Sequence, residues 1–153
     1  MEFFDIIKLT MRFLRLYFAV VLIAISTSSM SAQRFRIFAY DGEDYTVYLG
    51  NFTDSFDSNS IWNSFGTYGN EFSSESIWNE FSEYGNEYNP YSPWNEYSSY
   101  PPIIVDDEWY IVDYFSCGYM ASDNMRKLLK FIKKNFDEIA SDPSSFYDNY
   151  LDK

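Results

Sequence analysis

The feature that most constrains the fold is a 16-residue phrase that occurs three times in succession. The copies span residues 56–71, 72–87 and 88–102. Six positions agree in every copy: a first aromatic residue (Phe56, Phe72, Tyr88), a serine (Ser60, Ser76, Ser92), a tryptophan (Trp62, Trp78, Trp94), an asparagine (Asn63, Asn79, Asn95), a second aromatic residue (Phe65, Phe81, Tyr97) and a tyrosine (Tyr68, Tyr84, Tyr100). So regular a period requires one local structure built three times, and the centre of the chain is therefore a small repeat array.

Each copy is too short for the paired-helix and leucine-rich units, whose periods begin at about 20 residues. Ser60 can cap a helix, and Ile61 and Phe65 stand four residues apart. This spacing predicts one or two helical turns in each copy, followed by a glycine turn and a short extended segment. We expect the tryptophan of each unit to cover a sheet or to stack on the next unit. Prolines in the third copy, at positions 90, 93, 101 and 102, are typical of a terminal unit.

Two hairpins bracket the repeats. Residues 34–40 and 45–49 are β-branched and aromatic runs joined by Asp41-Gly42-Glu43-Asp44, and Gly50 is expected to end this hairpin. Residues 103–105 and 109–115 repeat the plan around an acidic turn at 106–108. Because an isolated hairpin is marginally stable in water, both are expected to form one small antiparallel sheet.

The chain after residue 121 has helical periodicity. Apolar residues recur at helical spacing behind a cap at Ser122 or Asp123: Met125, Leu128, Leu129, Ile132, Phe136 and Ile139. The opposite face is basic, which suits either a membrane or partner surface, or a solvated face whose cations pair with the acidic repeats; we favour the second. Asp142 and Pro143 predict the start of a short last helix.

The predicted fold class is therefore α+β: a small antiparallel sheet from two hairpins, wrapped by a three-copy 16-residue aromatic repeat, with a C-terminal amphipathic helix. We expect a hairpin-repeat-hairpin domain over residues 33–121 and a helical segment over 122–153. An aromatic content of 22% argues against disorder, since these side chains bury large areas with few rotatable bonds.

Residues 1–32 have the layout of a secretory signal peptide. Arg12 and Arg15 precede an apolar run over residues 16–25, and small residues follow up to Ala32, after which we expect cleavage. Met11 is a possible true start. We predict a secreted, periplasmic or cell-envelope protein that meets a membrane only through this segment before cleavage; an uncleaved anchor is the alternative.

The charge distribution excludes one class of partner. No Lys or Arg occurs between Ile37 and Met125, where sixteen Asp and Glu lie. Such a surface repels phosphate backbones, so we expect no nucleic-acid binding.

The residues that most catalytic sites require are also missing from the sequence. The chain has no His and one cysteine, Cys117, whose apolar surroundings predict a buried thiol. Zinc sites of the Cys/His kind and His-dependent nucleophiles are thereby excluded. We predict no enzyme, no cofactor and no metal; a carboxylate-only hydrolase and a calcium-stabilised structural protein remain alternatives.

The repeats themselves offer the candidate ligand-binding residues. The tryptophans can form a ladder that stacks on sugar rings while the asparagines supply hydrogen bonds: Trp62, Asn63, Trp78, Asn79, Trp94 and Asn95. The competing interpretation is that the tryptophans are core. The leading hypothesis is a noncatalytic extracytoplasmic binding or structural module for a glycan or an envelope protein. Acidic residues between the fixed positions are free to carry specificity: Glu71, Glu75, Glu80, Glu83 and Glu87.

The repeat phrases also resemble those of a group of uncharacterised bacterial exported or surface proteins. That group carries tandem S-I-W-N-x-[YF]-G-x-Y-G phrases closed by S-P-W-N and P-P-x-[IV]-V-D. Here the matching stretches begin at Ser60, Ser76 and Ser92, and the closure is Pro101 to Asp106. The resemblance covers residues 47–106 and implies a shared fold but no reaction. Asn70-Glu71 and Asn86-Glu87 depart from the expected small and basic residues, which weighs against an anionic ligand.

Overall fold

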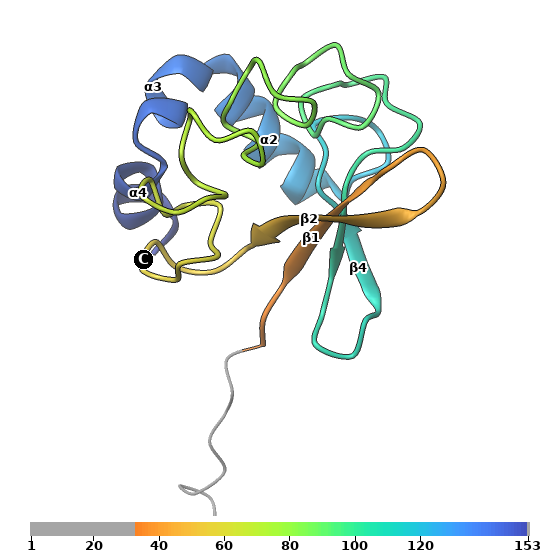
Figure 1. Cartoon of the computed structure of the whole chain (residues 1–153), viewed down its shortest axis with the longest axis horizontal. Coiled ribbons are helices and arrows are strands. Elements are labelled where there is room, and N and C mark those ends of the chain that lie inside the picture. The colour runs from red at the N-terminus through yellow and green to blue at the C-terminus, as the bar shows by residue number, and fades with distance from the viewer. Residues whose placement is uncertain (1–32, 153) are drawn as a thin grey trace, which may run out of the picture. The chain divides into compact units, whose positions relative to one another are not determined.

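The structure, a computed structural model, describes residues 33–152. The predicted signal peptide and Lys153 lie outside the described residues. Four strands form one antiparallel sheet in the order β2-β1-β3-β4 (Figure 1). Their bounds are β1 Arg36–Tyr40, β2 Tyr45–Asn51, β3 Ile103–Val105 and β4 Ile111–Tyr114. The expectation of a single small sheet made from two hairpins is confirmed.

Local chemistry sets the first hairpin. The Asp41 carboxylate accepts hydrogen bonds from the Thr46 hydroxyl and from the N–H groups of Asp44 and Glu43, and these bonds lower the pKa of Asp41 to about 2. Gly42 has a φ of +105°, which favours glycine. Strand β2 does not end at Gly50 but continues through it to Asn51.

The repeat segment contains no helix and no named strand between residues 52 and 102, so the predicted helical turns are wrong. Its backbone is instead a ribbon of successive turns, in which an N–H bonds the carbonyl three residues earlier. Asn63 bonds Ser60 at 3.3 Å and Gly66 bonds Asn63 at 2.9 Å, and the later units repeat this pattern. Ser and Asn side chains bond nearby backbone N–H groups, and such local bonds compete with helix formation.

The three tryptophans form a column through the ribbon. The ring centroids of Trp62 and Trp78 are 5.5 Å apart, and those of Trp78 and Trp94 are 5.6 Å apart. The indole N–H of Trp78 donates to the carbonyl of Ile61 at 2.5 Å, and that of Trp94 donates to Ile77 at 2.8 Å. The expected stacking of each unit on the next is therefore confirmed.

The C-terminal region forms several short helices rather than one. They are α2 Asp123–Lys134, α3 Phe136–Ser141, α4 Pro143–Phe146 and a π-helical turn, η1 Tyr147–Leu151. The predicted caps hold: Ser122 accepts the Met125 N–H, and Asp142 accepts the Ser145 N–H. The predicted long helix breaks at Asn135, whose side-chain amide donates to the Phe131 carbonyl at 2.8 Å and competes with helix continuation. None of the described helices is long and apolar enough to cross a membrane.

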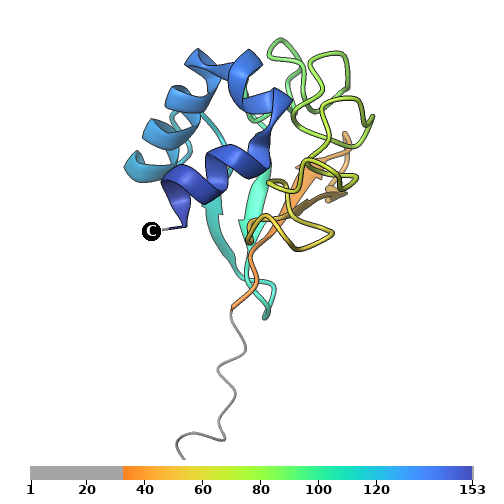
Figure 2. The ribbon, with the colours of Figure 1, turned by 90° about the vertical axis from the view of Figure 1, so that its left-hand side faces the viewer.

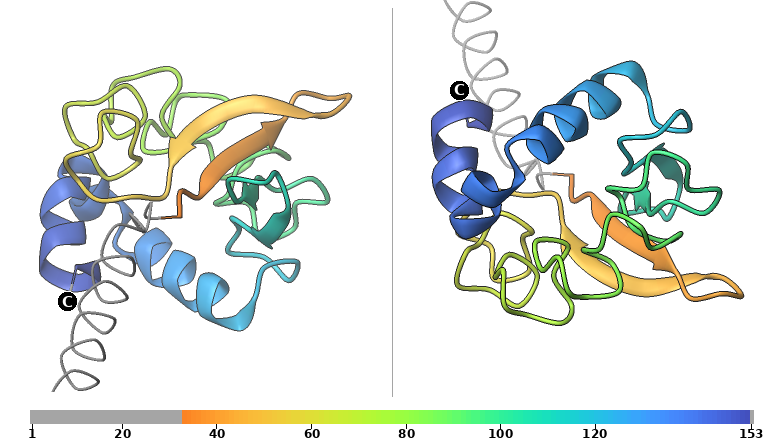
Figure 3. Two further views of the ribbon diagram at one scale, coloured as in Figure 1. Left: turned by 90° about the horizontal axis from the view of Figure 1, so that it is seen from below. Right: turned by 90° about the horizontal axis from the view of Figure 1, so that it is seen from above.

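These helices lie along the ribbon in reverse order (Figures 2 and 3). Helix α4 meets the first unit, because the Ser144 hydroxyl donates to the Trp62 carbonyl at 2.8 Å. Phe136 of α3 packs on Trp78 and Trp94, with ring centroids 6.2 and 5.4 Å away. On α2, Lys133 and Lys130 pair with Glu87 and Glu96 at 3.1 and 3.4 Å. The predicted pairing of the basic helix face with acidic repeats is thus present.

Candidate binding groove

The residues proposed from the sequence as ligand contacts lie in the scaffold. Trp62, Trp78 and Trp94 are 0%, 1% and 1% exposed, so their faces are covered by protein. Trp78 and Asn79 nevertheless border one of the pockets described below, and Trp94 borders another. The asparagine that follows each tryptophan uses both the oxygen and the nitrogen of its side-chain amide in hydrogen bonds within the repeat segment. Asn63, for example, accepts the Phe65 N–H at 3.0 Å and donates to the Asp57 carbonyl at 3.2 Å. Asn79 and Asn95 make the equivalent bonds.

A different set of aromatic rings faces solvent. These are the first and second fixed aromatics of each unit: Phe56 (87% exposed), Phe65 (96%), Phe72 (83%), Phe81 (89%), Tyr88 (83%) and Tyr97 (90%). The backbone N–H of each donates to an Asp or Asn side-chain oxygen two residues earlier, at 2.8–3.0 Å. The residues that supply the accepting oxygens are Asp54, Asn63, Asn70, Asn79, Asn86 and Asn95. Each ring therefore stands at the tip of a turn whose backbone is fixed.

The motif behind these turns occurs twice in each 16-residue period, so it can be found in the sequence only by looking for a period shorter than 16 residues. The motif is Asp or Asn, then Ser or Glu, then Phe or Tyr, and its six copies alternate nine and seven residues apart. Full burial of one such ring stabilises a protein by about 1.5–3 kcal/mol. Because the six rings lie in water, they do not contribute that stabilisation. Large exposed apolar patches are typical of interaction sites.

Four of the six rings line a groove between the ribbon and the C-terminal helices. Three adjoining pockets follow this seam, with volumes of about 690, 430 and 350 Å³. Phe65 and Phe72 line the first pocket, Phe72 and Phe81 the middle pocket, and Phe81 and Tyr88 the last pocket. We call this continuous feature the aromatic groove. Phe56 and Tyr97 line none of its three pockets.

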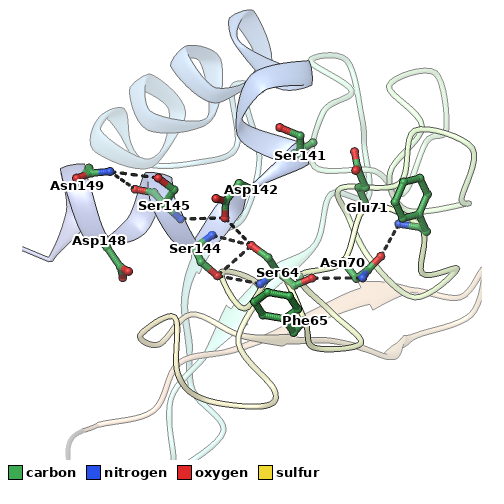
Figure 4. A pocket seen from close by; sticks show the side chains of 13 residues that line it. Ser64, Phe65, Asn70, Glu71, Ser141, Asp142, Ser144, Ser145, Asp148 and Asn149 are labelled. Carbon is green, nitrogen blue, oxygen red and sulfur yellow. Dashed lines mark hydrogen bonds between the residues drawn. The ribbon is translucent and has the colours of Figure 1, made fainter.

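The first pocket is held open by bonds between the ribbon and α4 (Figure 4). The Ser64 hydroxyl donates to Asp142 Oδ1 at 2.9 Å, and the Ser64 N–H donates to the Ser144 hydroxyl at 3.0 Å. In return, the Ser144 N–H donates to Ser64 Oγ at 3.1 Å. These bonds join segments 80 residues apart in the chain, so the walls of the pocket are fixed relative to each other.

The groove is acidic along its whole length. Carboxylates from both walls line it: Glu71, Asp142 and Asp148 in the first pocket, Glu80 and Asp137 toward the middle, and Glu87 in the last. Lys133 is the only cation among the described residues that line the three pockets. Its ammonium lies 3.1 Å from Glu87 and lowers the pKa of that carboxyl.

Three of the residues expected to be free for specificity, Glu71, Glu80 and Glu87, line the groove. Glu75 and Glu83 line none of its pockets. Exposed ring faces interleaved with carboxylates suit ligands that combine apolar faces with hydroxyl or cationic groups.

One further feature expected from the sequence concerns the cysteine. Cys117 is fully buried, as predicted, and burial raises the pKa of its thiol to about 11. Within residues 33–152, no group of three or more His, Cys, Asp or Glu side chains is placed to hold a metal ion.

Comparison with known proteins gives no match: no family model, curated protein or solved structure is significantly similar to this chain.

Proposed function

We propose that this chain is a noncatalytic extracytoplasmic binding module that holds an extended glycan in the aromatic groove. The observation that carries the proposal is the row of four rings, Phe65, Phe72, Phe81 and Tyr88, each 83–96% exposed and each set on a fixed turn along one groove. Ligand sites combine such aromatic faces with a few placed polar groups, and the apolar faces of sugar rings fit that arrangement.

The alternation of carboxylates with aromatic rings favours a glycan over a folded protein partner. In the groove, a glutamate directly precedes three of the rings: Glu71 before Phe72, Glu80 before Phe81, and Glu87 before Tyr88. The centre of a protein interface is depleted in charged residues. A sugar chain, by contrast, presents hydroxyl groups to carboxylates and apolar faces to rings at short intervals. The alternation along this groove therefore supports a polar polymer.

The proposal is tested by measuring binding to a panel of soluble oligosaccharides and envelope glycans by calorimetry and by amide chemical shifts. We expect at least one glycan to bind, with the shifts centred on residues 64–88 and 136–149. Phe72→Ser and Phe81→Ser should each weaken binding about tenfold, because about 1.4 kcal/mol of ring contact corresponds to a factor of ten.

Phe56→Ser and Tyr97→Ser are the matched controls. These rings have the same turn geometry and exposure but line none of the three pockets. Both controls should bind like the parent protein. Equal losses in all four variants, or no glycan binding by the parent protein, would contradict the proposal.

A second candidate, a hydrolase that uses carboxylates alone, is favoured by the three acidic residues in the first pocket. Two of them have structural partners, since Asp142 accepts bonds from Ser64 and Ser145, and Asp148 accepts one from Ser55 at 2.6 Å. Product analysis after long incubation with a bound glycan separates the two functions. Cleavage that disappears in both Glu71→Gln and Asp148→Asn would establish the hydrolase.

A further inference from the structure

The repeat makes the first and last pockets equivalent on their ribbon side. Phe65, Asn70, Glu71 and Phe72 line the first pocket. Phe81, Asn86, Glu87 and Tyr88 line the last, and each lies 16 residues further along the chain. The two pockets therefore present the same wall, with a carboxylate between two exposed rings.

Their helix walls differ in charge. In the last pocket, α2 supplies Lys133, whose ammonium lies 3.1 Å from Glu87 and 3.9 Å from Glu96. The volume of this pocket is about 350 Å³. In the first pocket the facing wall comes from α3, α4 and η1, and no Lys or Arg among residues 33–152 lines it. That pocket has a volume of about 690 Å³.

Glu71 is the equivalent of Glu87, and its carboxylate makes no hydrogen bond and no ion pair with any residue from 33 to 152. Figure 4 shows it on the ribbon wall, opposite the helix end that carries Ser141. Asp142 and Asp148 add negative charge to the same cavity. A carboxylate that holds an ammonium in one pocket thus stands without a cation in its repeat equivalent.

We propose that the first pocket binds a primary ammonium group of the ligand in the role that Lys133 fills in the last pocket. The inference rests on the proposed function and deepens it: the glycan carries free amino groups, as unacetylated amino sugars do. Glu71 forms the ion pair, and Phe65 and Phe72 offer ring faces that attract a cation. Ser145 and Asn149 lie on the facing wall, where hydroxyl groups of the sugar can bond.

The test compares β-linked glucosamine oligomers with their fully N-acetylated counterparts, at about pH 6, below the pKa of an ordinary amino group. We expect the amino oligomers to bind at least tenfold more tightly, with an affinity that falls as salt is added. Glu71→Gln should abolish this preference without changing the melting temperature, because the Glu71 side chain has no partner among the described residues. Glu75→Gln, an exposed glutamate outside the pockets, should retain the preference.

A second variant tests the pocket without removing Glu71. Ser145→Lys places an ammonium on the facing wall, as Lys133 does in the last pocket, and should abolish binding of the amino oligomer. Ser74→Lys is its control, because it adds the same charge at an exposed ribbon position that lines none of the three pockets, and it should bind normally.

Equal binding of both oligomers by the parent protein and by Glu71→Gln overturns this inference and leaves the proposed glycan function standing. Binding of oligolysine but of neither oligomer, with no glycan bound in the earlier panel, overturns both proposals, because the ligand would then be a basic peptide and not a glycan. No binding of any of these three probes, with a neutral glycan bound in the earlier panel, overturns the ammonium site alone.

Discussion

At the scale of single residues, a polar residue at a fixed position of the repeat bonds the backbone of an aromatic residue two positions later. A serine bonds the N–H of a tryptophan two residues later, as Ser60 does with Trp62 at 3.1 Å, and an asparagine does the same for the exposed aromatic that follows. The polar residue fixes the turn, and the aromatic two positions later is thereby aimed either into the core or into solvent. This is why a serine, a tryptophan and an asparagine recur together in all three units.

The first tryptophan differs from the other two in one bond. Trp78 and Trp94 donate their indole N–H to the preceding unit, whereas the buried Trp62 Nε1 finds no partner among residues 33–152. We expect Trp78→Phe to lower the free energy of unfolding by about 1 kcal/mol more than Trp62→Phe, since only the former removes a hydrogen bond. Urea unfolding of both variants measures the difference. A larger loss for Trp62→Phe would show that the bond has no net value here.

At the scale of elements, close approach of backbone within a unit decides where glycine is required. A Cβ atom on Gly85 would lie 1.9 Å from the Asn79 carbonyl oxygen, and one on Gly69 would lie 2.1 Å from that of Asn63. Neither glycine has a positive φ, so space rather than backbone conformation excludes a side chain. The turn ribbon is therefore held by sterics at the same point in the first two units.

Gly85→Ala is expected to destabilise the protein by about 1–3 kcal/mol, the usual range for forced overpacking. Glu83→Ala, an exposed substitution two residues away, should change stability by less than about 0.5 kcal/mol. Thermal and urea unfolding of the pair provide the measurement. If both variants were equally stable, the ribbon would have to shift freely at Gly85, contrary to the packing described above.

At the scale of the whole described unit, charges join the helices to the ribbon. The ammonium of Lys133 lowers the pKa of Glu87. A carboxyl with a lowered folded-state pKa contributes stability above its unfolded value, near 4.5, and loses that contribution as the pH falls through the folded-state pKa. Because the pair is partly exposed, its contribution is small, about 0.2–1 kcal/mol.

Lys133→Gln should therefore melt lower than the parent protein at pH 7, and the difference should close as the pH falls below 4.5 and through the lowered folded-state pKa of Glu87. Melting curves of both proteins at one ionic strength test this, and the comparison cancels the change in overall charge repulsion on acidification. A difference that stays constant with pH would mean that Lys133 stabilises through packing of its aliphatic chain instead.

Much of the fold could be predicted because its causes are local. The Asp41-Gly42 turn, the Ser122 cap and the Asp142-Pro143 helix start each depend on side chains that bond backbone a few residues away. The regular period likewise required three copies of one unit. The predicted helical turns are wrong because each Ser or Asn side chain accepts the N–H of the residue two positions later, and such bonds stabilise successive turns instead of capping a helix.

The sequence by itself determined that the aromatic positions of the three units are equivalent, since a repeated phrase repeats its local structure. It did not determine which way those aromatics point. Trp62 and Phe65 are both fixed and both apolar, yet one is fully buried and the other is 96% exposed. Only the tertiary structure decided this, because the burial of Trp62 depends on the stacking of successive repeat units and on helices more than 70 residues away in the chain. The same long-range packing placed Lys133 beside Glu87, whereas no cation in the described part of the chain lies beside its equivalent, Glu71.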